Sequence, residues 1–184
     1  MPSARRAVFL DRDGTLIFDR GYMHRPSDLR LRPHVSQGLR ELQARGFDLV
    51  LVTNQSGIGR GLFSHAELNR FHRALIARLA DSEIVLRRIY VCPHHPDAGC
   101  RCRKPGTALH RRAIRQLGLS PKRSFTIGDR AHDVVAGSRV GCRSVLLRTR
   151  YLHRELSEMI GFGVKPDFIA KDFLAAARWV VHAQ

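Results

Sequence analysis

The chain has 184 residues, 43% of them hydrophobic and 7% aromatic, which is typical of a folded globular protein. We expect one domain over residues 1–184, because chains usually divide only beyond roughly 250 residues. The longest apolar runs are strand-sized, far below the roughly 20 residues of a membrane helix, so we expect no membrane partner. No secretory leader precedes Asp11, and we expect a cytoplasmic monomer.

The net charge of +16 is the unusual bulk property of the chain. A charge of this size favours polyanionic partners such as nucleic acid or phosphorylated substrates. Arginine supplies 28 of the 32 basic residues, and these are spread along the chain without a basic block. Such a spread is typical of the codon bias of a GC-rich genome, so nucleic-acid binding stays open but is not the favoured hypothesis.

Short apolar runs alternate with segments of helical periodicity. In chain order the predicted elements are strand 7–10, helix 35–45, strand 47–52, helix 65–80, strand 89–91, helix 108–117, strand 124–127, helix 131–140, strand 144–147 and helix 172–181. Ser64 and Glu67 form a capping box, and Thr107 is expected to cap the helix that follows it. The apolar spacing of residues 168–181 indicates core packing, whereas the role of the segment after Tyr151 stays open.

Alternating strands and helices predict an α/β fold with a doubly wound, mostly parallel, Rossmann-like sheet. No linker, repeat or low-complexity stretch interrupts this pattern, and no segment is long enough for a large cap domain. Ligands of such sheets bind at the carboxyl ends of the strands. Side chains that directly follow a predicted strand are therefore the first candidates for a functional site.

Polar side chains follow three of the predicted strands. Asp11 and Asp13 leave the first strand, where Gly14 permits a sharp turn. Two carboxylates that diverge in this way can bind a metal ion and transfer a proton. Thr53 and Asn54 follow the second strand, Asp129 and Asp133 follow the fourth, and a loop contributes Lys104. Carboxylate oxygens suit Mg²⁺, which readily binds phosphate substrates, so this set predicts a magnesium site for phosphate chemistry.

Three of the four cysteines fall within eleven residues. The set comprises Cys92, His94, Cys100 and Cys102, with five residues between its two pairs. Three thiolates and one imidazole suit a closed tetrahedral Zn²⁺ site of a structural kind, which would order the loop that carries Lys104. His95 is a rival for the histidine position, although His94 fits the spacing better.

The motif Asp-Arg-Asp-Gly-Thr at residues 11–15, with Thr-Asn at 53–54, Lys104 and Gly-Asp at 128–129, resembles the haloacid dehalogenase-like phosphatases over residues 7–150. The resemblance implies Mg²⁺-dependent hydrolysis of a phosphomonoester through an aspartyl phosphate. It implies these roles: Asp11 as nucleophile, Asp13 as general acid and base, Thr53 and Lys104 as phosphoryl stabilisers, and Asp11, Asp13 and Asp129 at the Mg²⁺, with Asp133 in support.

The zinc-ligand pattern narrows the resemblance to the branch that holds histidinol phosphatases and heptose-bisphosphate phosphatases. Gly-Tyr at 21–22, Thr-Asn-Gln-Ser-Gly-Ile at 53–58, Arg-Gly at 60–61 and Cys-Arg-Lys-Pro at 102–105 are similar to the heptose side of this branch, which implies removal of the 7-phosphate from D-glycero-D-manno-heptose 1,7-bisphosphate. The residues implied to bind substrate are Asp19, Arg20, Gly21, Tyr22, Asn54, Gln55, Ser56, Arg60, Arg103 and Arg130.

Three alternatives remain beside this hypothesis. The five-residue gap between the zinc pairs and the arginine at 130 are also typical of histidinol-phosphate phosphatases. The run Thr-Asn-Gln at 53–55 and the positive charge would also suit a polynucleotide 3′-phosphatase, although the zinc loop argues against it. A non-catalytic nucleic-acid-binding module on the same fold would be favoured by loss of an acidic residue, but Asp11, Asp13 and Asp129 are all present.

Overall fold

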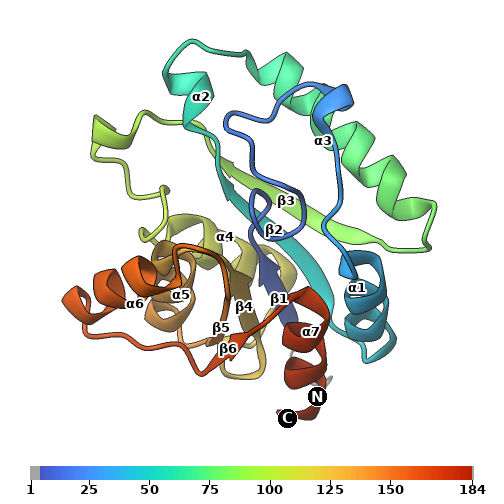
Figure 1. Cartoon of the computed structure of the whole chain (residues 1–184), viewed down its shortest axis with the longest axis vertical. Coiled ribbons are helices and arrows are strands. Elements are labelled where there is room, and N and C mark those ends of the chain that lie inside the picture. Colours follow the sequence, from blue (N-terminus) through green and yellow to red (C-terminus); the bar gives the residue numbers. More distant parts are fainter. Residues whose placement is uncertain (1–4, 184) are drawn as a thin grey trace.

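The computed structural model describes residues 5–183, and its strands form one six-stranded parallel sheet (Figure 1). The strands lie in the order β3-β2-β1-β4-β5-β6, and every neighbouring pair runs parallel. Their bounds are β1 Ala7–Leu10, β2 Asp48–Asn54, β3 Leu86–Cys92, β4 Phe125–Gly128, β5 Arg143–Leu147 and β6 Phe168–Ala170. The predicted doubly wound parallel sheet is confirmed.

Five α-helices match the predicted ones to within two residues at each end, and two more were not predicted. The matching helices are α1 Val35–Ala44, α3 His65–Ala80, α4 Ala108–Leu117, α5 Ala131–Arg139 and α7 Phe173–His182. The other two are α2 Ser56–Gly59 and α6 Leu152–Gly161. None of the helices in the described part of the chain has the length and apolar character needed to cross a bilayer.

Helices cover both faces of the sheet, and the alternation of side chains along the strands explains why (Figure 1). On β1, Val8 and Leu10 join the core beneath α1, α3 and α7, whereas Ala7 and Phe9 face the other way, toward α4. A third cluster packs α5 and α6 against β5 through residues such as Leu146 and Met159. Strands buried on both faces read as continuous apolar runs, which is the pattern seen in the sequence.

Local capping signals were mostly right. The Ser64 side chain accepts a hydrogen bond from the Glu67 N–H, and Glu67 returns one to the Ser64 N–H, so the predicted capping box is confirmed. Thr107 does precede α4, but the cap prediction was wrong in its chemistry. Its hydroxyl accepts a hydrogen bond from the Arg111 side chain at 3.1 Å and makes no bond to the helix backbone.

The chain after residue 147 departs most from the sequence-based expectation. Residues 168–170 form strand β6, which pairs with residues 145–147 of β5 and extends the sheet by one strand. A three-residue strand is too short for its periodicity to stand out from core packing. Helix α6 packs against α5, so the segment after Tyr151 lies beside the carboxyl ends of β4 and β5 (Figure 1).

Candidate active site

The strand order brings residues from distant parts of the chain to one edge of the sheet. The strands after β1 are added first on one side, as β2 and β3, and then on the other, as β4, β5 and β6, so the strand order reverses at β1. The N–H of Asp11 donates to the carbonyl of Ile127 at 3.1 Å, so the turns after β1 and β4 lie side by side. Asp11, Asp129 and Asp133 gather there, with carboxylate oxygens within 4.8 Å of one another. Such a reversal is where open parallel sheets bind ligands.

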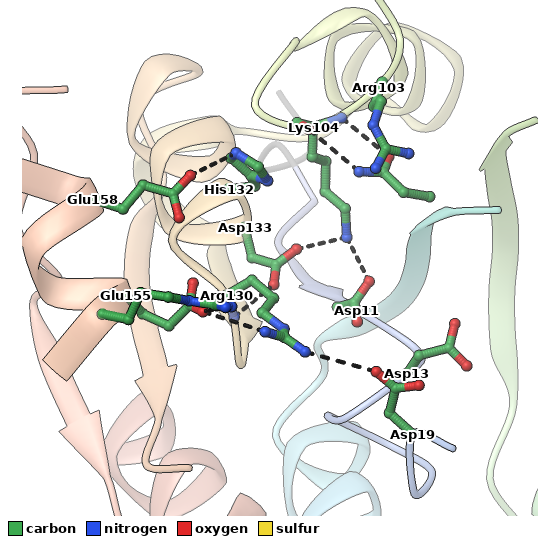
Figure 2. Close-up of a pocket in the computed structure, with 12 residues that line it drawn as sticks. Asp11, Asp13, Asp19, Arg103, Lys104, Arg130, His132, Asp133, Glu155 and Glu158 are labelled. Atoms are coloured by element: carbon green, nitrogen blue, oxygen red, sulfur yellow. Dashed lines mark hydrogen bonds and ion pairs between the residues drawn. The ribbon is translucent and has the colours of Figure 1, made fainter. Parts of the chain in front are cut away.

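Lys104 is the cation at the centre of this group. Its ammonium lies 2.5 Å from Asp11, 2.6 Å from Asp133 and 2.6 Å from the carbonyl of Val52, and its side chain is buried. Figure 2 shows the two carboxylates reaching the ammonium from two sides. Asn54 fixes the backbone of Lys104, because its side-chain oxygen accepts from the Lys104 N–H at 3.0 Å and its amide donates to the Lys104 carbonyl at 3.2 Å.

The charges of the group favour a divalent cation. Burial raises the pKa of Asp11 to about 6, although the Lys104 ammonium opposes the rise and the Asp133 carboxylate adds to it. Burial, followed by the Asp11 and Asp133 carboxylates, raises the pKa of Asp129 to about 8. In both carboxyl groups burial disfavours the charged form more than the neighbouring cations favour it, which are Lys104 and, for Asp129, also Arg130. Their oxygens fit Mg²⁺, which takes carboxylate ligands together with water or phosphate oxygens.

Two glycines leave space for the carboxylates. Gly14 has a φ of +82°, and a Cβ there would lie 2.3 Å from Oδ2 of Asp129. A Cβ at Gly128 would likewise lie 2.3 Å from the Asp133 side chain. A side chain at Gly14 would displace the carboxylate of Asp129, and one at Gly128 would displace that of Asp133. Glycine is therefore needed at both positions to leave space for the two carboxylates.

Asp13 has a different environment from the other carboxylates. Its oxygens accept from the Arg12 guanidinium at 3.0–3.1 Å and from the Gln55 amide at 2.7 Å. The sequence predicts Asp13 as the third Mg²⁺ ligand, and that role stays a prediction; the carboxylates whose oxygens lie within 4.8 Å of one another are those of Asp11, Asp129 and Asp133. Burial raises the pKa of Asp13, and the Arg12 guanidinium opposes the rise.

A cavity of about 330 Å³ opens above the carboxylates. The predicted site residues that line it are Asp11, Asp13, Asp19, Asn54, Arg103, Lys104, Arg130 and Asp133. A larger neighbouring cavity, of about 710 Å³, is lined by Arg20 and Gly21 among others and shares Asp19 and Arg130 with the first. Tyr22, Ser56 and Arg60 line neither cavity, and Thr53 and Gln55 are buried beneath the first one.

Helix α6 contributes residues to this site that the sequence did not indicate. Glu155 is buried and accepts from the Ala131 N–H at 2.8 Å and from Arg130 at 3.3 Å. Arg130 also lies 3.7 Å from Asp19, a pair visible in Figure 2. Nε2 of His132 lies 2.8 Å from the Glu158 carboxylate on the cavity wall. The amphipathic spacing of residues 152–161 was the one available signal, and it does not reveal which acid turns inward.

The four predicted zinc ligands form a compact cluster outside the cavity. Distances between Cys92, His94, Cys100 and Cys102 ligand atoms that are in contact run from 3.1 to 3.6 Å. A tetrahedron with metal–sulfur bonds of about 2.3 Å has edges of about 3.8 Å, so the cluster has the size of a zinc site. His94 supplies its Nδ1, whereas His95 turns to Asp97, which settles the choice between the two histidines.

Comparisons with known proteins agree with this geometry. A family model described as HAD-hydrolase-like matches residues 101–176. The chain is 41% identical to the D-glycero-beta-D-manno-heptose-1,7-bisphosphate 7-phosphatase of Haemophilus ducreyi over 79% of this chain and 84% of that protein. It is 36% identical to the D-glycero-D-manno-heptose-1,7-bisphosphate 7-phosphatase of Thermosynechococcus vestitus, over 96% and 95%.

The crystal structure of a D,D-heptose 1,7-bisphosphate phosphatase from B. bronchiseptica, complexed with magnesium and phosphate, superimposes with a TM-score of 0.86. The two chains are 31% identical, and the match covers 97% of this chain and 99% of that one. The fold and the acidic cluster thus identify the protein as a haloacid dehalogenase-like phosphatase. Within that class, the chain belongs to the family of the D-glycero-D-manno-heptose-1,7-bisphosphate 7-phosphatases.

The role of Gly14 in leaving space for the Asp129 carboxylate can be tested with a matched pair of variants. Gly14→Ala and Gly46→Ala both place a methyl group at a positive φ, +82° and +77°, but only the first meets a neighbouring side chain. We expect Gly14→Ala to weaken Mg²⁺ binding by about tenfold or more, because the methyl group displaces Asp129. Gly46→Ala should retain wild-type affinity in the same calorimetric titration. Equal Mg²⁺ affinity in the two variants would contradict this role of Gly14.

Proposed function

We propose that this protein removes the 7-phosphate of D-glycero-D-manno-heptose 1,7-bisphosphate by transferring it to Asp11 and then to water. The observation that carries this proposal is the Asp11 carboxylate at the end of β1, 2.5 Å from the Lys104 ammonium and beside Asp129 and Asp133. This carboxylate is largely but not fully buried, with 11% of its side chain exposed, and it faces a positive charge. The names of the relatives support the choice of sugar.

In the first step an Asp11 oxygen attacks phosphorus, the bond between phosphorus and the sugar oxygen breaks, and Asp13 gives its proton to that oxygen. Lys104 offsets the negative charge that makes attack by a carboxylate on a phosphate unfavourable. Mg²⁺, which Asp11, Asp129 and Asp133 would hold, supplies further positive charge to the phosphoryl oxygens when it is bound. Asp11, Asp13, Lys104 and Asp133 line the first cavity, and Asp129 lines the neighbouring one.

In the second step water attacks the phosphorus of the aspartyl phosphate, and Asp13 takes a proton from that water. Inorganic phosphate leaves, and Asp11 returns to its starting form. One group can serve as acid and then as base because the first step leaves it deprotonated. Asp13 borders the cavity while its oxygens stay bonded to Arg12 and Gln55, which suits a residue that exchanges protons without moving.

A bisphosphate substrate needs cations for the phosphate that is not cleaved. Of the arginines implied to bind substrate, Arg103 and Arg130 line the cavity, and Arg154 of α6 lines it as well. One terminal nitrogen of Arg103 is buried without a hydrogen-bond partner among the described residues, which favours an anionic ligand there. Arg130 contacts Asp19, Asp129 and Glu155, so it would bind a phosphate as part of a charge network.

The choice of substrate is tested by a steady-state comparison. The compounds are heptose 1,7-bisphosphate, histidinol phosphate and a 3′-phosphorylated oligonucleotide. We expect the highest kcat/KM with the heptose bisphosphate, with the phosphate at C1 retained in the product. The five-residue gap between the metal-binding pairs favours histidinol phosphate as the second candidate, and a higher kcat/KM with that compound would replace the sugar in this proposal.

The role of Asp11 is tested by Asp11→Asn, with Asp81→Asn at the exposed end of α3 as the matched control. An amide cannot form the aspartyl phosphate, so we expect turnover to fall by roughly a thousandfold or more. The near-ultraviolet circular dichroism spectrum should stay that of the folded protein. Asp81→Asn should be as active as the unmodified enzyme. Substantial activity in a homogeneous Asp11→Asn preparation would rule Asp11 out as the nucleophile.

Zinc is the proposed occupant of the cysteine and histidine cluster, where it would hold the loop that carries Arg103 and Lys104. We expect about one zinc per chain by metal analysis. Cys100→Ser should lose the zinc and raise KM, since the loop would no longer hold the two cations in place. Cys142→Ser changes a buried cysteine outside the cluster and should keep the metal. Full zinc content in Cys100→Ser would show that the ligand set is wrong.

A further inference from the structure

Arg12, between the two aspartates of the first motif, has a completely buried side chain. Its guanidinium lies over the ring of Phe71, 4.6 Å from the centroid. Burying a charge is costly unless it is paired and hydrogen-bonded. An apolar residue of similar volume would fill the same space at no such cost, so the contacts of Arg12 call for a functional explanation.

Every nitrogen of the Arg12 guanidinium has an acceptor. Nε donates to both oxygens of Asp13 at 3.1 Å, and Nη2 donates to Asp13 at 3.0 Å. Nη2 also donates to the carbonyl of Met23 at 2.7 Å and to Oε1 of Gln55 at 2.9 Å, and Nη1 lies 3.1 Å from Nε2 of His72. A planar guanidinium group with this many hydrogen bonds has little freedom to move.

The donors and acceptors of this network can be assigned without ambiguity. A guanidinium only donates, so Nε2 of His72 must be the unprotonated nitrogen of a neutral ring, and the atom of Gln55 that faces Arg12 must be its oxygen. The amide nitrogen of Gln55 then faces Asp13 and Thr53, both at 2.7 Å. Gln55 has its amide engaged on both sides and is buried, which leaves it no free group for a substrate.

We propose that Arg12 and Gln55 are positioning residues that hold the Asp13 carboxylate in the orientation needed for proton transfer, with His72 fixing Arg12 from behind. Together they supply donors to both Asp13 oxygens, while about one fifth of the Asp13 side chain stays exposed to the cavity. This inference rests on the proposed function, because it assigns these residues to the acid and base of that reaction. It also gives Gln55 a role different from the substrate contact implied by its motif.

The proposal predicts that the two chemical steps respond differently to substitution. With p-nitrophenyl phosphate the leaving group is a weak base that needs little protonation, so the first step depends little on Asp13. Hydrolysis of the aspartyl phosphate still needs Asp13 to take a proton from water. Misplacing Asp13 should therefore slow the second step and spare the first, whereas general damage to the phosphate site should slow both.

The experiment compares Gln55→Leu and Arg12→Lys with the unmodified enzyme, and Arg73→Lys on the exposed face of α3 serves as a matched control. Rapid mixing with p-nitrophenyl phosphate gives the rate of the first nitrophenol release, and the steady state gives the rate of hydrolysis. We expect hydrolysis to fall by about 10- to 100-fold in both variants, with a burst of about one nitrophenol per enzyme at little-changed rate. Arg73→Lys should match the unmodified enzyme.

An equal loss in both steps, or no loss in either, would overturn the assignment. Arg12→Lys does not touch Thr53, so it separates the hold on Asp13 from any effect of Gln55 on the phosphate site. If Arg12→Lys fails to fold, Gln55→Leu decides, because it removes the amide that donates to Asp13, and the rate of the first release reports any effect that it has through Thr53. Failure of the proposed phosphatase chemistry has a different signature: the unmodified enzyme would then release no nitrophenol at all, whereas a different preferred substrate would leave this comparison unchanged.

Discussion

The confinement of three carboxylates around one ammonium is the constraint on which this structure depends. Lys104 contacts Asp11 and Asp133 directly and Arg130 lies 3.4 Å from Asp129, yet burial raises the pKa values of Asp11 and Asp129 despite these cations. A divalent cation would stabilise the ionised carboxylates and offset the negative charge of a bound phosphate. The site is therefore built for a ligand of that chemistry rather than for stability.

The rest of the fold serves to hold that group together. The parallel sheet delivers Asp11 and Asp129 from adjacent strands, and Asn54 at the end of β2 fixes the backbone of Lys104. The cysteine and histidine cluster lies directly before Lys104 in the chain, and α6 supports the opposite wall through Glu155. Arg12 and Gln55 hydrogen-bond to Asp13, the residue that we propose transfers the proton.

Much of this was predictable from the sequence, and the reasons for success and failure are physical. Buried parallel strands appear as apolar runs followed by polar residues, so Asp11 and Asp129 were readable as neighbours from their spacing. The spacing of residues along the sequence does not reveal the direction in which a side chain points in the folded protein. For this reason Gln55, expected to contact substrate, could not be seen to turn inward toward Asp13, and the approach of Asp133 to Asp11 needed coordinates. Glu155 was missed because, in the sequence, a glutamate on the buried side of an amphipathic helix cannot be told from an exposed one.

The claim that experiment can test most directly is that the phosphoryl group is transferred to the Asp11 carboxylate. Acid quenching during turnover followed by borohydride, which reduces an acyl phosphate to an alcohol, marks the residue that carried the phosphoryl group. Peptide mass spectrometry should then find homoserine at position 11 only when substrate was present. Homoserine at another aspartate, or none at any position while an aspartyl phosphate standard is reduced in parallel, would contradict the account.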